Sequence, residues 1–401
     1  MKLDFEETRD LWKSLESLKR HFEKGGKLER LYPLFEAQES FLFVPPTATK
    51  SAVHVRDAMD IKRLMSMVIV ALLPCVLIGM YSVGFQKLAA LGQATGLLSC
   101  LMHGAWHMMP IVITSYAVGG IWEVLFAVVR RHEINEGFLV TGILFPLTCP
   151  PTLPLWMVAG GISFGVVIGK EVFGGTGMNV LNPALTARAF VFFAYPANMS
   201  GDGVWTAVDP TKQVVVDSFT GATPLAVVAQ SQAGQGAVQT LNAAGFTWWD
   251  AFWGFIPGSI GEVSAFACLL GALVLIVTGV GSWQIMVSMV LGAIGGSYLM
   301  SAVATPTSAA IMTLPWTWHL VVGGFAFGCA FMATDPVSAA ATATGKWIYG
   351  FLTGVLSILI RAVNPAFPEG VMLAILFMNV FAPLIDHFVV RGNARRRLAR
   401  V

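Results

Sequence analysis

Charged residues are scarce in this sequence, and they are unevenly distributed. Only 12% of the 401 residues are Asp, Glu, Lys or Arg, against roughly 25% in a typical soluble domain, whereas 55% are hydrophobic. Residues 1–63 hold 12 of the 25 Lys and Arg, and residues 391–400 hold five more. This composition argues against a soluble domain and against a basic nucleic-acid-binding face, and it places the middle of the chain in a lipid bilayer.

Motifs for metals and dinucleotides are also missing. The five cysteines occur singly in apolar surroundings, without a CxxC pair, so we interpret them as packing residues and predict no transition-metal site. His103 and His107 are four residues apart but lack the glutamate of an HExxH motif, and Gly175-Thr176-Gly177 is not GxGxxG. A dinucleotide-binding site is therefore not expected in this chain.

The order of apolar segments predicts an all-α polytopic membrane protein with about ten transmembrane helices. Residues 1–63 are too charged for a secretory signal peptide and form a cytoplasmic arm. The first transmembrane half covers 64–196, a polar insert follows at 197–261, the second half covers 262–390, and 391–401 is a basic cytoplasmic tail. The apolar segments are expected at 64–84, 109–129, 138–150, 154–169, 180–196, 262–281, 283–303, 317–334, 346–363 and 369–390.

The loop charges agree with ten crossings and with both termini in the cytoplasm. Arg130, Arg131, Lys170 and Lys346 all fall on the face assigned to the cytoplasm, as the positive-inside bias requires. The insert 197–261 has a net charge of −3 and is expected outside.

The two halves contain a repeated pattern. Thr-Leu-Pro at 152–154 and again at 313–315 precedes a Gly-Gly pair, and several segments are shorter than a full crossing. Related halves with broken helices are common in membrane proteins that hold a ligand near the midplane. The repeats run in the same direction by this count, which leaves their relationship open.

The insert contains the sequence Asp-Ser-Phe-Thr-Gly-Ala-Thr at 217–223. Its spacing alone is compatible with a polar turn, because Gly221 allows a tight bend and Thr223 precedes a proline, which favours extended backbone. The same loop would also present a threonine hydroxyl, which is the group that a phosphoester to a cofactor needs.

The pattern Asp-x-x-Thr-Gly-Ala-Thr is similar to the flavinylation motif, in which a transferase attaches FMN through its phosphate to the last threonine. Nearly the whole chain resembles the B subunits of the Na⁺-translocating NADH:quinone oxidoreductases. The stretches that carry the resemblance are NEGF at 135–138, PPTLPLW at 150–156, KEVFGGTG at 170–177, LNPA at 181–184, GSIGEV at 258–263, MATDPVS at 332–338, NPAFPEG at 364–370 and FAPLIDH at 381–387.

This resemblance implies a covalent flavin. Thr223 would carry FMN, Thr220, Gly221 and Ala222 would complete the motif, and Asp217 would help a separate flavin transferase to recognise the loop. The flavin would perform the electron transfer, and the protein would orient and tune it.

The resemblance also implies a noncovalent riboflavin that hydrogen-bonds to Thr141, Asn179 and Asn182. Asn179 and Asn182 are three residues apart, so they lie on one face of a helix. Without the resemblance, the simpler interpretation is a polar helix start, since Asn is a good helix cap.

A quinone site is implied near Gly119, Gly120, Phe190 and Phe192, where a flat ring would fit between small residues and aromatic faces. The simpler interpretation of the two glycines is close packing of helices.

Charges within apolar segments are costly and are therefore functional candidates. The resemblance assigns Glu123, Asp335 and Asp386 to Na⁺ uptake from the cytoplasm, and Asp386 is the strongest of the three. A structural alternative for Asp335 is the cap of a following short helix. For Arg188 and Arg361 the alternative is pairing with a carboxylate or with the carbonyls of a broken helix.

The resulting expectation is one component of a multi-subunit complex in the bacterial inner membrane, with the flavin loop in the periplasm. Electrons would pass from a partner to FMN, then to riboflavin and ubiquinone, with Na⁺ translocation coupled to their transfer. Two alternatives remain at this point. The related D subunit of the Rnf complex shares the threonine motif, and a channel or transporter would have a similar helical shell.

Overall fold

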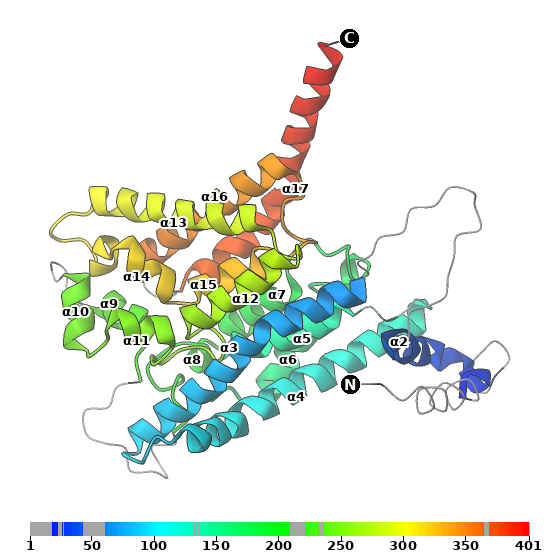
Figure 1. Cartoon of the computed structure of the whole chain (residues 1–401), viewed down its shortest axis with the longest axis horizontal. Helices are drawn as coiled ribbons and strands as arrows, with labels where there is room; N and C mark the ends of the chain where they lie inside the picture. The colour runs from blue at the N-terminus through cyan, green and yellow to red at the C-terminus, as the bar shows by residue number, and fades with distance from the viewer. Residues whose placement is uncertain are drawn as a thin grey trace.

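A computed structural model describes residues 18–22, 26, 28–42, 61–131, 134, 136–208, 221–231, 234, 236–364 and 369–400. Within these ranges the chain is helical and contains no β-strand (Figure 1). A helix satisfies its own backbone hydrogen bonds, so it is the expected element for an apolar chain in lipid.

Six helices are long and apolar enough to cross a membrane. Five of them span at least the roughly 20 residues that the hydrocarbon core requires, and α6 counted with the η2 turn Glu171–Phe173 spans 19. The prediction of an all-α polytopic membrane protein is therefore confirmed. These helices are α3 (Ile61–Ala90), α4 (Leu97–Arg130), α6 (Leu155–Val167), α13 (Trp283–Val303), α16 (Ala343–Val363) and α17 (Val371–Leu398).

The other four predicted segments are short or interrupted. Three are single apolar helices: α5 (Gly137–Leu147), α7 (Pro183–Ala194) and α12 (Ala265–Val277). The segment predicted at 317–334 is divided into α14 (Trp316–Val321), α15 (Phe325–Phe327) and the π-helix η4 (Gly328–Met332). Gly323 and Gly324 separate α14 from α15 with φ values of 64° and 66°, a conformation that side chains with a Cβ rarely adopt.

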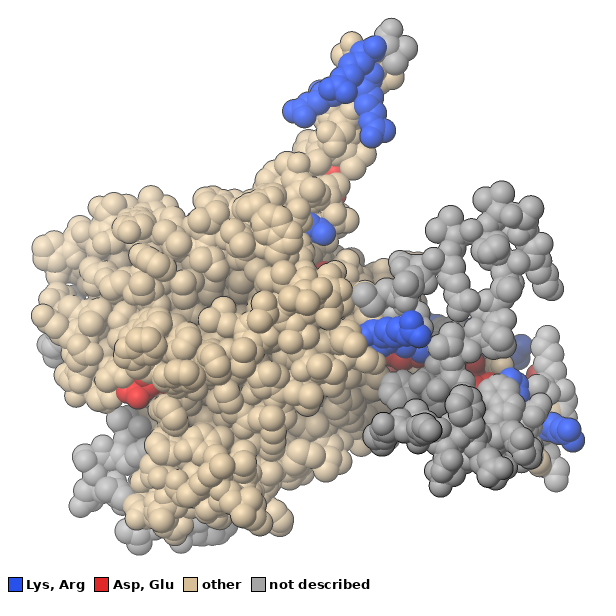
Figure 2. Space-filling model, viewed as in Figure 1, with Lys and Arg blue, Asp and Glu red and all other residues tan. Residues whose placement is uncertain are grey.

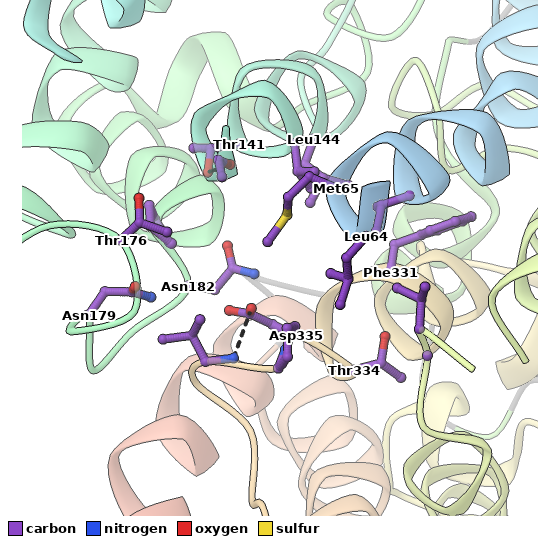
Figure 3. Close-up of a pocket in the computed structure, with 18 of the residues that line it drawn as sticks. Leu64, Met65, Thr141, Leu144, Thr176, Asn179, Asn182, Phe331, Thr334 and Asp335 are labelled. Atoms are coloured by element: carbon purple, nitrogen blue, oxygen red, sulfur yellow. Dashed lines mark hydrogen bonds between the residues drawn. The ribbon is translucent and has the colours of Figure 1, made fainter. Parts of the chain in front are cut away.

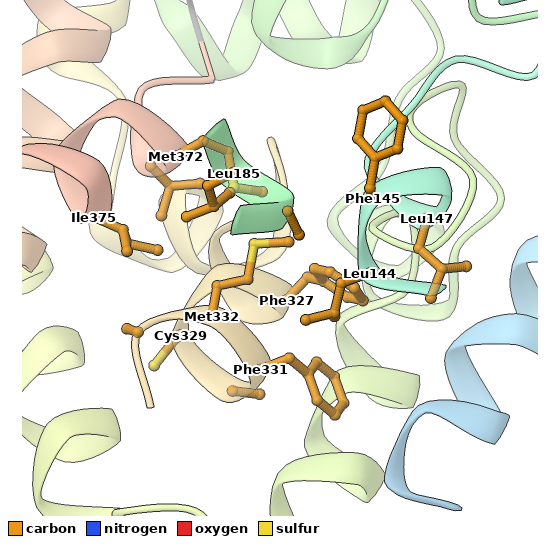
Figure 4. Close-up of a cluster of buried hydrophobic side chains, with 14 of the residues drawn as sticks. Leu144, Phe145, Leu147, Leu185, Phe327, Cys329, Phe331, Met332, Met372 and Ile375 are labelled. Atoms are coloured by element: carbon orange, nitrogen blue, oxygen red, sulfur yellow. The ribbon is translucent and has the colours of Figure 1, made fainter. Parts of the chain in front are cut away.

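The main core lies where helices of the two halves meet. Figure 4 shows buried side chains of α5 and α7 converging on those of η4 and α17. The free cysteines Cys75, Cys100, Cys149, Cys268 and Cys329 are all buried, which confirms their interpretation as packing residues. The labelled members of this core are Leu144, Phe145, Leu147, Leu185, Phe327, Cys329, Phe331, Met332, Met372 and Ile375.

The insert forms a separate layer of short helices with its own apolar core. Leu225, Leu241 and Trp318 are buried there, so the layer packs on the second half through α14. It lies at the opposite end of the molecule from α2 (Figure 1). Its helices are α9 (Pro224–Gln230), α10 (Ala237–Ala243) and α11 (Trp248–Trp253), joined by η3 (Ala310–Thr313). The short helix α8 (Pro196–Met199) follows α7 and packs on the main core through Met199, and the arm contributes η1 (Glu29–Leu31) and α2 (Tyr32–Leu42).

Basic side chains gather in two places on the visible face of the molecule. Figure 2 shows them at the projecting end of α17 and beside α2, with a largely uncharged surface between. The basic tail that the sequence sets apart at 391–401 continues α17 as far as Leu398.

Candidate functional site

A cavity between the two halves brings together residues that the sequence assigns to different roles. Thr141 of α5 lines it with Asn179 and Asn182, which precede α7, and with Asp335, which follows η4. Figure 3 shows these polar side chains around one space, whose apolar wall includes Leu64, Met65, Leu144 and Phe331. We call this space the central cavity.

Asn182 begins α7. Its Oδ1 accepts hydrogen bonds from the backbone N–H groups of Ala184 and Leu185, at 3.0 and 3.3 Å, so the helix-cap interpretation is confirmed. The cap uses the side-chain oxygen and leaves the amide NH₂ group at the cavity wall. Asn179 donates from Nδ2 to the carbonyl of Leu181 at 2.9 Å, and its Oδ1 takes no part in that bond.

Asp335 holds a turn at the end of η4. Its carboxylate accepts from the hydroxyl of Ser338 at 2.6 Å and from the backbone N–H of Val337 at 3.3 Å (Figure 3 shows the second bond). No helix of the described chain begins at this point, so the prediction that Asp335 caps a short helix is wrong. One helical turn does form, because the N–H of Ala339 donates to the Asp335 carbonyl at 3.1 Å. It does not continue into a helix, because the N–H groups of Ala341 and Thr342 bond to Asp386 instead.

Glu123 lies in the interior of α4 and pairs with Lys170. Lys170 also lines the central cavity and donates to the Thr176 hydroxyl at 3.2 Å, with Glu171 Oε1 3.5 Å away. The sequence predicted Lys170 only as a loop charge on the cytoplasmic face. Its buried ammonium instead connects Glu123 to the cavity wall, which a charge count along the chain does not show.

Asp386 is the third predicted sodium residue, and it lies apart from the central cavity, on α17. Its carboxylate accepts from the backbone N–H groups of Ala341 and Thr342, at 2.6 and 3.1 Å, and from the Thr342 hydroxyl at 2.5 Å. The structure therefore brings Asp335 and, through Lys170, Glu123 to one cavity, while Asp386 joins α17 to the start of α16.

The predicted quinone residues lie on two helices that both pack against α6. Gly119 of α4 is covered by the ring of Phe138, and an added Cβ would lie 2.4 Å from that ring and 3.0 Å from Ile162 of α6. Phe190 of α7 stacks on Phe164 of α6, with ring centroids 4.4 Å apart. The close-packing interpretation is confirmed for Gly119.

The neighbouring predicted residues differ from these two. Gly120 has open space around it, because only Phe138 lies within 4 Å of an added Cβ, at 3.9 Å. Phe192 packs against the ring of Phe193.

Thr223 caps α9 in the outer layer. Its Oγ1 accepts a hydrogen bond from the backbone N–H of Ala226 at 3.2 Å, Ala222 is buried, and Gly221 packs against the carbonyl of Asp202. The other two motif residues, Asp217 and Thr220, lie outside the described residues.

Arg188 and Arg361 satisfy backbone carbonyls at the helix breaks. Arg188 donates from Nε to the carbonyl of Thr148 at 2.9 Å and pairs with Glu369. Arg361 donates from Nη1 to the carbonyl of His319 at 2.9 Å, and from Nη2 to those of Val322 and Gly323 at 2.9 and 3.1 Å. The alternative that gave both arginines these structural roles is confirmed.

Glu262 and Glu369 belong to the same group, and neither was singled out from the sequence. Each stands beside a predicted segment boundary, where a carboxylate ordinarily reaches water. Only the fold encloses them with the two arginines. We call Arg188, Arg361, Glu262 and Glu369 the arginine–glutamate cluster.

Comparisons with known proteins show the family of this chain. A family model described as the NQR2, RnfD, RnfE family matches residues 48–395. The B subunit of the Na(+)-translocating NADH-quinone reductase of Pseudomonas paraeruginosa is 52% identical, over 96% of this chain and 98% of its own length. The B subunits of the same name from Azotobacter vinelandii and Chromohalobacter salexigens are 51% and 50% identical, again over 96% of this chain and over 98% and 96% of their own lengths. The chain therefore belongs to the NQR2, RnfD, RnfE family.

Proposed function

We propose that this chain is the flavin-bearing membrane component of a Na⁺-translocating NADH:quinone oxidoreductase. The observation that carries the proposal is Thr223, which completes the flavinylation sequence and whose side chain lies beside a cavity under the outer layer. The relatives named as B subunits support it, because the match covers nearly the whole length of both chains.

The position of Thr223 suits a phosphoester. Its oxygen acts as a hydrogen-bond acceptor in the cap of α9, and an ester oxygen still accepts. The capping geometry therefore does not require the hydroxyl proton that a flavin transferase would replace. The bound flavin would supply the electron-transfer chemistry, while the loop fixes where it is attached.

Replacing Thr223 by valine should abolish the covalent flavin. Denaturing electrophoresis should show a fluorescent band for the wild-type chain and none for Thr223→Val. Thr247→Val is the matched control, because Thr247 also caps a helix of the outer layer and the loss of either cap costs about 0.5–2 kcal/mol. A fluorescent band that survives in Thr223→Val would exclude this attachment site.

We further propose that the central cavity holds riboflavin. The cavity has an apolar wall for a flat ring and polar groups on one side, which is the usual composition of a small-molecule site. Thr141, Asn179 and Asn182 would hold the polar edge of the flavin and its ribityl chain.

Asn182→Asp separates the two roles of Asn182. Aspartate caps a helix as well as asparagine does, so thermal stability should change little, but the amide donors are lost and a negative charge is added. We expect noncovalent riboflavin, extracted with acid and quantified by chromatography, to bind roughly tenfold more weakly, as the loss of about 1–3 kcal/mol implies. Asn242→Asp, on the exposed face of α10, is the control, and equal riboflavin content in both variants would contradict the proposal.

The remaining roles follow the same proposal. Quinone would bind around α6, near Gly119, Gly120, Phe190 and Phe192. Glu123, Asp335 and Asp386 would serve Na⁺ uptake, since carboxylate oxygens are ligands that hard cations prefer.

The membrane orientation is also part of the proposal. The arm and the end of α17 would face the cytoplasm of a bacterial inner membrane, and the outer layer with Thr223 would face the periplasm. Other subunits of the complex would supply the NADH site and the first flavin, and a flavin transferase would load Thr223.

The N-terminal arm favours this function over an Rnf-type D subunit. The family model begins at residue 48, whereas the relatives named as B subunits match 96% of the chain, so their similarity extends over most of the arm.

A further inference from the structure

A second cavity lies directly beside Thr223. Thr223, Pro224 and Leu225 form one wall, and residues 256–263, which connect α11 to α12, form another. Gly323 and Gly324 at the break before α15 and the side chain of Glu369 close it. The threonine of the outer layer and the two glutamates of the arginine–glutamate cluster therefore line one space.

Two buried polar atoms at this cavity make no hydrogen bond of good geometry within the described chain. They are Oε1 of Glu262, a residue that is 8% exposed, and Oγ of Ser259, a residue that is 3% exposed. The Ser259 side chain is near enough to favour the ionised form of Glu262, but the two residues do not satisfy each other fully, which leaves room for a further polar group in the space they line. Gly324 keeps the space open, because an added Cβ would lie 2.5 Å from Glu262 Oε2.

The charges around Glu262 balance only when its carboxyl is ionised. Arg188 and Arg361 contribute two positive charges and Glu369 one negative charge, so a neutral Glu262 leaves the cluster with one unpaired positive charge. A phosphodiester on Thr223 would bring one negative charge to this region. The titratable groups that face Glu262 are Arg188 of α7, Arg361 of α16, Glu369 before α17, and the thiols of Cys149 and Cys268.

Burial dominates the titration of this carboxyl. Glu262 lies in the connection before α12, outside the six candidate crossings, and loss of water raises its pKa to about 8 despite the opposing effect of Arg188. The carboxyl is therefore mostly protonated at pH 7 and is ionised at mildly alkaline pH, where added negative charge nearby would raise its pKa further.

We propose that Glu262 is the proton-holding residue of the flavin on Thr223. The inference rests on the proposed function, because it requires the flavin to be attached there. In the pH range where its carboxyl is ionised, the Glu262 carboxylate binds one proton from water when one electron reaches the flavin from the partner that supplies it. When the electron leaves, the carboxyl releases that proton. Glu262 acts on the flavin potential through charge and is a positioning residue, with no bond formed to the flavin.

The test is a potentiometric titration of the covalent flavin in the whole complex between pH 7 and 10. In the wild-type complex the midpoint potential should change little below about pH 8, where Glu262 is already protonated, and should fall above it by up to about 59 mV per pH unit, the value of a tenfold change for a one-electron couple. Glu262→Gln should remove most of this slope, and Glu262→Asp should retain it. Asp250→Asn, which removes an outer-layer carboxylate that caps α11 and does not line the cavity, should behave as wild type.

The outcomes separate this inference from the proposed function. A fluorescent band at Thr223 together with a pH-independent potential in the wild-type complex would overturn the role of Glu262 alone, as would a slope that persists in Glu262→Gln. The absence of any band from the wild-type chain would overturn both. Should Glu262→Gln fail to assemble, the wild-type slope and its retention in Glu262→Asp still decide the question.

Discussion

Replacing Arg361 by leucine should prevent the complex from assembling stably. The Arg361 side chain is fully buried, and the substitution leaves the carbonyls of His319, Val322 and Gly323 without their donors at the break between α14 and α15. It also removes the bond from Nε to the carbonyl of Glu369, at 2.8 Å. Each unpaired buried carbonyl costs about 1–3 kcal/mol, so we expect a total loss of several kcal/mol.

The measurement is the melting temperature of the detergent-solubilised complex, read from intrinsic fluorescence. Arg361→Lys should lower the melting temperature by an intermediate amount. Lysine keeps the positive charge but lacks the planar guanidinium group that donates to several carbonyls at once. Arg391→Leu is the control, since Arg391 is an exposed arginine of α17 whose replacement should change stability by less than about 0.5 kcal/mol. A wild-type melting temperature for Arg361→Leu would show that the break does not depend on this side chain.

Gly292→Ala should separate α13 from α16. An added Cβ at Gly292 would lie 2.1 Å from the carbonyl oxygen of Phe351, and a backbone atom has no other rotamer to adopt. One helix must move, and overpacking of this kind costs about 1–3 kcal/mol. α13 and α16 form an extensive helix pair, so the movement should also lower the melting temperature of the complex.

Gly295→Ala provides the matched control on the same helix. Gly295 is exposed, and its added Cβ meets only the ring of Phe351, at 3.9 Å. Because alanine favours the helix over glycine by about 1 kcal/mol, Gly295→Ala should be neutral or slightly stabilising. Equal melting temperatures for the two alanine variants would rule out close backbone contact at Gly292.

Much of the fold could be predicted because lipid imposes simple rules on sequence. Each of the ten predicted apolar segments contains helix, and the cysteines are buried as expected. The boundaries were less accurate. α4 begins at Leu97, although the apolar segment was predicted only from residue 109. In this first part Gly104 packs on the backbone of Met80 and holds the helix against α3, a contact that hydropathy does not predict.

The candidate site residues were also grouped only in part from the sequence. Thr141, Asn179 and Asn182 were grouped by resemblance, and the fold brings them to one cavity. Asp335 joins them from the second half, which no local pattern predicts, because the contact depends on how α5 and η4 pack. Asp386 was grouped with Asp335 from the sequence, yet it lies apart on α17.

The sequence by itself determined the class of the protein and the position of Thr223, because hydropathy and a seven-residue motif are local properties of the chain. Only the tertiary structure decided which charges share a buried space. Arg188, Arg361, Glu262 and Glu369 are separated by up to 181 residues, and each alone resembles a costly charge within an apolar segment or at its boundary. The free-energy cost of burying each charge depends on how the helices pack, because packing sets both the burial of a side chain and the distance to its partner.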